Sequence, residues 1–373
     1  MKEFERHLDT INSCRFCPMC RHVCTVSESM HRETVTPKGK GLTLFSILKG
    51  LQTFDRDVAE VMYQCALCQV CHEWCVGNWD ITDPILEARR RIVSLGIEPA
   101  QVRQIRTNII EEGNPYGGKR DERFASIGSV PVKKGASVLY FAGCGTAYRR
   151  PEIARAAIAV LKAPGIKYTL LSDEECCGAY LDIMGYREDA RALAQKNVER
   201  FKDSGCNTLV MGCPHCLYTI KEMYPQWGVK LPEGIRLIHT TTYLRELVMQ
   251  DRIKLKPLHK TATYQDPCRL GRYCGIYKDP RDVLISMDGL NLVEMRWNRE
   301  KANCCGYGSG LALTFPKLAD NIAMDRFAQA KKTKAEILIT ACQSCKSAFL
   351  DQSSKENSLK IMDLVELVAE NIA

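Results

Sequence analysis

No stretch of this 373-residue chain is apolar for long enough to cross a membrane. A spanning helix takes about 20 consecutive apolar residues, so no transmembrane segment is predicted. The polar start MKEFERHLDT also lacks the apolar segment of a secretory signal. We therefore expect a cytoplasmic protein that reaches a membrane only through a partner, as a peripheral subunit.

Long runs of charge of one sign are also absent. The formal net charge is +8, but Lys and Arg are scattered, and the longest basic run is ARRR at 88–91. Proteins that bind nucleic acid gather their basic residues into one patch or stripe. We therefore expect no nucleic-acid partner.

The chain also lacks the motifs of an enzyme that works alone with a dissociable cofactor. We find no Gly-rich dinucleotide fingerprint, no Ser/His/Asp set and no flavin motif in the sequence. If the chain carries out redox chemistry, its electrons must come from another protein.

Cysteine, by contrast, is abundant, with 20 residues. Disulfide frameworks are rare in the cytoplasm, where clustered cysteines more often bind metal or carry out redox chemistry. The cysteines fall into four groups, at 14–24, 65–75, 144–216 and 268–345. The first two groups share one spacing and the last two share another.

The first two groups both read C-x2-C-x2-C-x3-C. Such a run wraps a loop around a cubane [4Fe-4S] cluster, and its fourth cysteine often ligates the other cluster. Zinc sites more often use two short pairs a dozen or more residues apart. We therefore predict two cubanes, one held by Cys14, Cys17, Cys20 and Cys75 and the other by Cys65, Cys68, Cys71 and Cys24.

The sequence around these motifs favours helices. Stretches at 40–51, 57–65 and 83–96 have helical patterns. The fourth cysteines are followed by Thr25 and Val76 rather than by the Pro of small β-rich ferredoxins. The 40-residue gap between the motifs resembles instead the helical ferredoxin domains of succinate dehydrogenase iron–sulfur subunits and of heterodisulfide reductase.

The rest of the chain predicts a parallel sheet covered by helices. Apolar runs at 137–143, 168–172 and 208–213 alternate with amphipathic stretches at 152–162 and 188–205. The order recurs about 125 residues later, a period too long for a solenoid. The second set comprises strand-like runs at 262–268, 290–295 and 336–342 and a helix-like stretch at 317–332.

We therefore predict an α+β multidomain protein whose α/β part is duplicated. The segment at 113–137 is rich in Gly, Ser and charge and has no periodicity. The expected parts are an all-helical ferredoxin-like domain at 1–112, a connecting segment at 113–136, and two Rossmann-like lobes with parallel sheets at 137–255 and 256–373.

The spacing that the two lobes share contains five cysteines in each lobe, more than the four that hold a tetrahedral zinc or a cubane. Four of these ten cysteines follow predicted strands, and α/β sheets bind ligands at the carboxyl ends of their strands. Adjacent cysteines on a loop there could bind different irons of one cluster. The candidates are Cys144, Cys176, Cys177, Cys213 and Cys216 in the first lobe and Cys268, Cys304, Cys305, Cys342 and Cys345 in the second.

The cysteine segments of the lobes resemble a known family. FAGCGTAY, ECCGAY, GCPHC, QDPCRLGR, CCGYGSG and ACQSC are similar to the tandem CCG domains of heterodisulfide reductase subunits and of the iron–sulfur subunits of glycolate and lactate dehydrogenase systems. With the N-terminal motifs, the resemblance covers nearly the whole chain, in the fused order of the D-type heterodisulfide reductase subunit.

The resemblance implies one non-cubane [4Fe-4S] cluster in each lobe, held by all five cysteines, with zinc in one lobe as the alternative. It also implies a flavoprotein partner, an FAD-dependent dehydrogenase subunit. Cys206 and Cys274 fall outside the spacing and are expected to be incidental thiols. His215 lies between two ligand candidates, where it either hydrogen-bonds a cluster sulfur or simply begins a helix.

Three functions follow from these predictions. The first is an electron-transfer subunit that carries electrons between a flavoprotein dehydrogenase and a quinone or another acceptor. The second is a catalytic reductase that cleaves a disulfide or thiol-derived substrate at the two non-cubane clusters, so the catalytic candidates are the CCG cluster sites themselves. The third, a zinc-stabilised scaffold, would require eight ferredoxin-spaced cysteines to be purely structural. We favour the first.

Overall fold

The computed structural model describes residues 2–128, 135–353 and 359–373. Residues 129–134 of the predicted connecting segment and residues 354–358 of the predicted second lobe lie outside the described residues. The described residues before 138 form helices, short 3-10 turns and loops without a strand, as the helical prediction requires. These helices are α1 (Leu8–Cys14), α2 (Thr25–Met30), α3 (Pro37–Leu48), α4 (Arg56–Tyr63), α5 (Val70–Glu73), α6 (Thr82–Ser94) and α7 (Ala100–Glu112).

Local capping begins two of these helices. The Thr36 side chain accepts a hydrogen bond from the backbone N–H of Gly39 at the start of α3, and Asp55 accepts one from Val58 at the start of α4, both at 2.8 Å. Such caps satisfy N–H groups that have no partner inside the helix. The loops that carry the cysteine motifs are therefore held between helices with fixed ends.

The rest of the chain forms two lobes, each built on a four-stranded parallel sheet. The strand orders are β2-β1-β3-β4 and β6-β5-β7-β8. The first lobe contains β1 (Val138–Phe141), α8 (Cys144–Arg149), α9 (Pro151–Lys162), β2 (Tyr168–Thr169), α10 (Ala179–Met184), α11 (Arg187–Asp203), β3 (Thr208–Met211), α12 (Pro214–Tyr218), α13 (Tyr224–Gln226), β4 (Arg236–His239) and α14 (Thr240–Met249). The second contains β5 (Thr261–Gln265), α15 (Lys278–Ile285), β6 (Asn291–Leu292), α16 (Leu311–Thr314), α17 (Pro316–Lys331), β7 (Ile337–Thr340), α18 (Gln343–Ser353), β8 (Lys360–Asp363) and α19 (Leu364–Glu370).

The strand order defines a switch point in each sheet. After β1 the chain adds β2 on one side and then β3 on the other, and the second lobe repeats this with β5, β6 and β7. Open α/β sheets bind ligands outside the carboxyl ends of the strands at such a point. The predicted mixed fold, with helices first and duplicated parallel-sheet lobes after them, is confirmed. The exact domain limits stay predictions.

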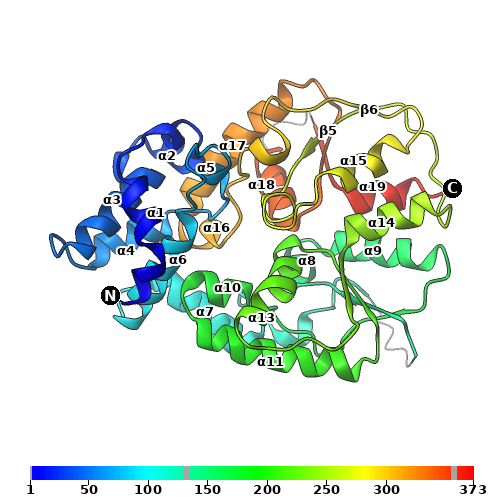
Figure 1. Ribbon diagram of the computed structural model, residues 1–373. Coiled ribbons are helices and arrows are strands. Elements are labelled where there is room, and N and C mark those ends of the chain that lie inside the picture. The colour runs from blue at the N-terminus through cyan, green and yellow to red at the C-terminus, as the bar shows by residue number, and fades with distance from the viewer. Residues whose placement is uncertain (1, 129–134, 354–358) are drawn as a thin grey trace.

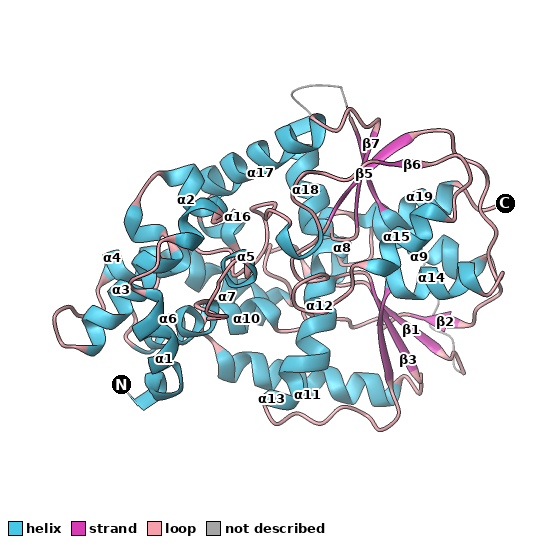
Figure 2. Cartoon of the chain, turned by 45° about the horizontal axis from the view of Figure 1, so that its top comes forward, coloured by secondary structure: helices cyan, strands magenta, loops and turns pink. Residues whose placement is uncertain are grey.

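The two lobes pack against each other through equivalent helices. Helix α9 of the first lobe contacts α19 of the second, and α14 of the first contacts α15 of the second. Figure 2 shows these four helices between the two fans of strands. One cluster of buried apolar residues includes side chains of both sheets, among them Tyr140 and Tyr264. The lobes therefore share part of their core.

The N-terminal helices lie on the side of the molecule opposite the C-terminus and contact both lobes (Figure 1). The Tyr63 hydroxyl donates to the carbonyl of Met184 at 2.7 Å, and Arg89 donates to the carbonyl of Ile183 at 2.9 Å. On the other lobe, α2 contacts α17. The ferredoxin-type loops are therefore held against both lobes.

Candidate iron–sulfur sites

The lobe cysteines lie at the carboxyl ends of the strands. Cys144 begins α8 three residues after β1 ends, and Cys213 precedes α12, two residues after the end of β3. Cys268 and Cys342 follow β5 and β7 in the same way. The cysteines therefore flank the switch point of each sheet, where the topology favours ligand binding.

The five candidates of the first lobe form one buried series of sulfur contacts. Cys144 contacts Cys176, Cys176 contacts Cys177, Cys177 contacts Cys216, and Cys216 contacts Cys213. Hydrogen bonds from Cys176 and Cys216 lower the pKa of the Cys177 thiol to about 6. The thiolate is the form that binds iron, so this site favours a metal-binding state of Cys177.

The second lobe repeats the series. Cys268 contacts Cys304, Cys304 contacts Cys305, and the Sγ atoms of Cys305 and Cys345 lie 3.1 Å apart. Cys345 in turn contacts Cys342. Hydrogen bonds from Cys304 and Cys345 lower the pKa of Cys305 well below its ordinary value.

A glycine after each cysteine pair shapes both sites. Gly178 and Gly306 have φ angles of 85° and 83°, in the left-handed region that favours glycine. Each donates its backbone N–H to the first cysteine of its pair, Cys176 or Cys304, at 3.4 Å. A Cβ at Gly306 would also lie 2.6 Å from the carbonyl oxygen of Ala319. The glycine therefore makes a turn that a side chain would obstruct.

The two sets of cysteines face one narrow cavity of about 50 Å³ between the lobes. Gln343 of the second lobe reaches across it and donates to the Cys213 Sγ of the first lobe at 2.9 Å. A Cβ at Gly145 would lie 2.4 Å from the Gln343 side chain, so the lobes approach closely here. The cysteines that line the cavity are Cys144, Cys176, Cys177, Cys213, Cys216, Cys268, Cys305, Cys342 and Cys345.

The remaining cysteine of the second lobe, Cys304, contacts the N-terminal domain. Its Sγ hydrogen-bonds Cys68, a contact that lowers the pKa of the Cys68 thiol to about 6. Arg272 donates to the Cys68 carbonyl, and the Tyr273 hydroxyl donates to the Leu67 carbonyl at 2.7 Å. The two adjacent cysteines of the second lobe therefore face different sites. Cys305 lines the shared cavity, whereas Cys304 contacts a ferredoxin-type loop.

The N-terminal cysteines are grouped as an exchange of fourth ligands requires. Cys24 lines one apolar cavity together with Cys65, Cys68 and Cys71. The pKa of the Cys14 thiol is raised to about 12, mainly by burial and to a smaller extent by the charges of the nearby Cys75 and Cys20. Which cysteines bind which cluster stays a prediction.

Four buried cations near the sulfurs support an anionic group at these sites. Lys40, Arg89, Arg269 and Arg326 are each at most 7% exposed and form no ion pair with a carboxylate among the described residues. Within the described part of the chain, the Lys40 amine donates to the Val35 carbonyl alone, and its charge interacts with the nearby cysteine thiols. All four cations donate hydrogen bonds to carbonyl, amide or hydroxyl oxygens, but a buried charge without a counter-charge still costs several kcal/mol. A cluster and its thiolates carry the negative charge that these positions lack.

The donor set and its surroundings thus fit iron–sulfur clusters. In the described ranges, no three Cys, His, Asp or Glu side chains converge as the ligands of a single metal ion do. Backbone N–H groups also donate to the sulfurs of candidate ligands, for example from Leu67 to the Cys65 Sγ at 3.4 Å and from Trp79 to the Cys75 Sγ at 3.3 Å. When bound, such clusters supply one-electron redox chemistry.

The predicted connecting segment at 113–136 forms part of the wall of the first-lobe site. Arg123 is 3% exposed, donates to Glu174 at 2.6 Å and lies 3.8 Å from the Cys144 Sγ. The Gly113 carbonyl accepts the backbone N–H of Cys176 at 2.8 Å. Sequence reasoning missed both roles, because the segment has no periodic pattern.

The remaining sequence candidates occupy ordinary positions. Cys206 donates its thiol to the Ala136 carbonyl at 3.2 Å, apart from the sulfur series, and burial raises the pKa of Cys274 to about 12. His215 lies in the first turn of α12, with its ring 6.2 Å from that of Tyr180. Burial, and then the charge of Arg269, lower the His215 pKa well below its ordinary value, so its ring is neutral.

Comparison with known proteins identifies the class. A cysteine-rich domain named CCG matches residues 138–221 and 262–349, one copy in each lobe. The chain is 34% identical over 329 residues to the D-type subunit of the dihydromethanophenazine:CoB–CoM heterodisulfide reductase of Methanosarcina barkeri (strain Fusaro), covering 86% of this chain and 79% of that protein. The chain belongs to the family of that subunit, and the resemblance found in the sequence is confirmed.

Other comparisons agree. The chain is 29% identical over 335 residues to the EtfAB:quinone oxidoreductase of Syntrophomonas wolfei subsp. wolfei, covering 83% of this chain and 46% of that protein. The crystal structure of a hypothetical protein from Helicobacter pylori shares the fold, with a TM-score of 0.59, 12% identity, and coverage of 99% of this chain and 75% of that one. The chain is thus an iron–sulfur subunit of an oxidoreductase. Among the described helices, none is both long and apolar enough to cross a bilayer.

Proposed function

We propose that the protein transfers electrons between a flavoprotein dehydrogenase and a quinone or another acceptor, through two cubane clusters and one non-cubane [4Fe-4S] cluster in each lobe. The ligands are the eight ferredoxin-spaced cysteines and the ten lobe cysteines named above. The limits 1–112, 137–255 and 256–373 are proposed as the three cluster-bearing domains.

The contact between Cys68 and Cys304 carries this proposal. It joins the site of Cys24, Cys65, Cys68 and Cys71 directly to the second-lobe site, and the shared cavity joins that site to the first lobe. Since electron transfer slows steeply with distance, we propose one order of clusters. The clusters follow one another in this order: the cubane whose site includes the exposed Cys17, the second cubane, the second-lobe cluster and the first-lobe cluster.

Metal and EPR analysis tests the proposal. Protein purified without oxygen should contain about sixteen irons, with separate signals from two cubanes and two unusual clusters during stepwise reduction and oxidation. About eight irons, with or without zinc, would leave only the cubanes and contradict the assignment of the lobes.

The partner is proposed from the family and from the relatives. A related protein is named EtfAB:quinone oxidoreductase, and this name supports the proposal of a quinone as the acceptor. We expect a reduced FAD protein of the dehydrogenase class to reduce the cubanes of the purified chain within seconds. A test that mixes the two proteins and follows the cubane EPR signal would contradict this partner if no signal grows.

The shared cavity favours a second candidate function, reduction of a disulfide. Nine of the ten candidate lobe cysteines face the same narrow space, so a disulfide that enters it would lie between both clusters. Two electrons and two protons would convert it into two thiols. Reduced methyl viologen should then be oxidised in step with thiol formation, and viologen that stays reduced in the presence of disulfides would contradict this candidate.

Lys40 should raise the reduction potential of the cubane beside it, because its buried charge faces Cys24, Cys65 and Cys71. A Lys40→Met variant should lower that potential by roughly 50–100 mV, since removal of a nearby positive charge disfavours the added electron. EPR-monitored redox titration measures the shift. Lys49→Met, an exposed change just beyond the end of the same helix, serves as the control and should leave the potential within about 20 mV of the wild type.

A further inference from the structure

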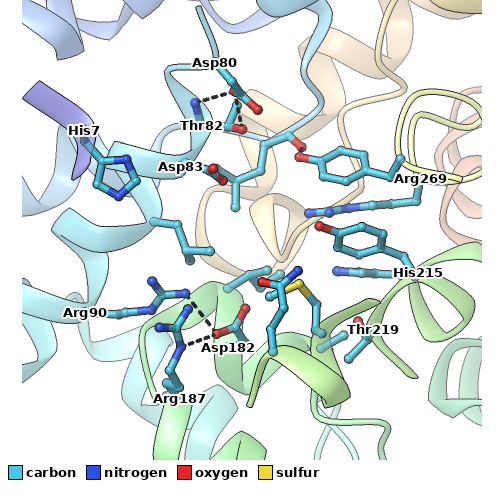
Figure 3. A pocket seen from close by; sticks show the side chains of 18 of the residues that line it. His7, Asp80, Thr82, Asp83, Arg90, Asp182, Arg187, His215, Thr219 and Arg269 are labelled. Carbon is cyan, nitrogen blue, oxygen red and sulfur yellow. Dashed lines mark hydrogen bonds and ion pairs between the residues drawn. The ribbon is translucent and has the colours of Figure 1, made fainter. Parts of the chain in front are cut away.

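One arginine lies where the second lobe meets the cubane site that includes Cys68. The segment after Cys268 carries two arginines, Arg269 and Arg272. Arg269 extends into a cavity that the N-terminal helices line together with the first lobe, as Figure 3 shows. Arg272 instead lies beside the contact between Cys68 and Cys304, which carries the proposed electron route. Arg272 therefore faces two cluster sites at once.

Arg272 binds the backbone on both sides of this contact. Its Nε donates to the carbonyl of Cys68 in the N-terminal domain, and one Nη donates to the carbonyls of Glu300 and Ala302, at 2.8 and 2.9 Å. The last two residues belong to the loop that leads into the adjacent cysteines of the second lobe. Because a guanidinium is planar and its donors have a fixed geometry, these bonds set the distance between the two loops.

The charge of Arg272 is not balanced by a carboxylate in the part of the chain that the structure describes. Its second Nη atom is buried there without a hydrogen-bond partner. The charge interacts most strongly with the thiols of Cys68, Cys268 and Cys304. These thiols are candidate ligands of two different clusters. A positive charge between two redox groups stabilises an electron that is added to either of them.

The first lobe has a different residue at the matching position. Arg272 follows Cys268 by four residues, whereas the residue four positions after Cys144 is Tyr148. The Tyr148 hydroxyl donates to the carbonyl of Lys119 at 3.0 Å, in the segment before the first lobe. The arginine thus occurs in the lobe whose cysteine pair contacts a cubane ligand.

We propose that Arg272 is the positioning residue for electron transfer between the cubane site of Cys68 and the second-lobe site of Cys304. It holds the two ligand loops in contact, and its charge stabilises an electron at either site. One cluster loses one electron and the other gains it, and no bond is formed or broken. The inference rests on the proposed function, because both clusters must be present.

Rapid-freeze EPR and redox titration of the anaerobic holoprotein test the proposal. After mixing with a photoreduced protein donor, Arg272→Met should pass electrons from the cubane to the second-lobe cluster about tenfold more slowly than the wild type, because the loops are no longer held in position. Reduction of each cluster should also become about tenfold less favourable, which is 59 mV for one electron. Wild-type rates and potentials in a variant with full iron content would overturn the proposal.

Arg272→Lys separates the charge from the position. Lysine keeps the positive charge but cannot reproduce the fixed donor geometry of the guanidinium. This variant should therefore retain the wild-type potentials and only part of the rate. If Arg272→Lys and Arg272→Met lower the potentials equally, the charge has no effect and the proposal fails. Arg299→Met is the control, since Arg299 lies in the same loop but is 46% exposed and pairs with Glu294 at 3.4 Å. It should behave as the wild type.

Iron content separates this inference from the function on which it rests. If Arg272→Met loses second-lobe iron, Arg272→Lys decides. A wild-type rate in Arg272→Lys would then overturn the proposal, whereas slow transfer between intact clusters would support it. Wild-type protein with four reducible clusters, together with an Arg272→Met variant that matches it, would refute the inference alone. Wild-type protein without lobe clusters would refute the proposed function and this inference with it.

Discussion

A Cys305→Ser variant should lose the second-lobe cluster, and electrons should then no longer reach the first-lobe cluster. Cys305 connects Cys304, which contacts the N-terminal cysteine Cys68, to the sulfurs at the shared cavity. Serine offers no thiolate for iron. Because the second lobe lies between the cubanes and the first lobe in the proposed order, its loss should interrupt the path.

The equivalent change in the other lobe should have a smaller effect. Cys177→Ser removes a first-lobe ligand candidate that has the same position in its pair, but the second-lobe cluster should still be reduced. Each variant should contain about four fewer irons than the wild type. The readout is rapid-freeze EPR after mixing with a photoreduced protein donor that is too large to enter the cavity between the lobes.

Cys206→Ser is the control for both variants, since this thiol contacts the Ala136 carbonyl and lies outside both sulfur series. It should keep all irons and wild-type kinetics. If Cys177→Ser blocks reduction of the second lobe while Cys305→Ser leaves the first lobe reducible, the proposed order is reversed.

Glu174→Gln should destabilise the protein by about 3–5 kcal/mol, the usual effect of breaking a buried ion pair from one side. The Glu174 and Arg123 side chains are 0% and 3% exposed, and their charged atoms lie 2.6 Å apart. Glu174 also accepts the backbone N–H groups of Ala142 and Gly143, at 2.8 and 2.9 Å. The substitution leaves the Arg123 charge buried and loosens the loop that carries Cys144.

The neighbouring carboxylate provides a matched control. The Asp173 side chain is 64% exposed and pairs with Arg200 at 2.7 Å, so Asp173→Asn should cost less than about 1 kcal/mol. Urea unfolding followed by tryptophan fluorescence compares the variants, and iron analysis should show a first-lobe deficit in Glu174→Gln only. Equal midpoints for the two variants would show that the ion pair does not hold this site together.

The sequence predicted the parts of the structure that depend on local pattern. Apolar runs and amphipathic stretches located the helical domain and the two sheets, and the cysteine positions followed from the strand ends. The strands β4 and β8 were not predicted as strands, because each begins at an exposed charged residue, Arg236 or Lys360, and runs directly into a helix.

The residues that complete the sites could not be predicted, because their roles depend on contacts far along the chain. Lys40 and Arg269 look like surface cations in a sequence, and only packing shows that both are buried. Likewise, 236 residues separate Cys68 from Cys304, so no spacing rule joins the two motifs. One signal was available, since three acidic residues at 173–175 precede the first cysteine pair, and a buried partner for one of them could have been sought.

The pairing of α9 with α19 and of α14 with α15 has the form of an isologous dimer interface. In each lobe, a helix between the first two strands meets the last helix of the other lobe, so both lobes present equivalent surfaces to each other. A single lobe with such a surface would be complementary to a copy of itself. The fused chain thus has the form of a homodimer whose two halves are joined by one peptide segment.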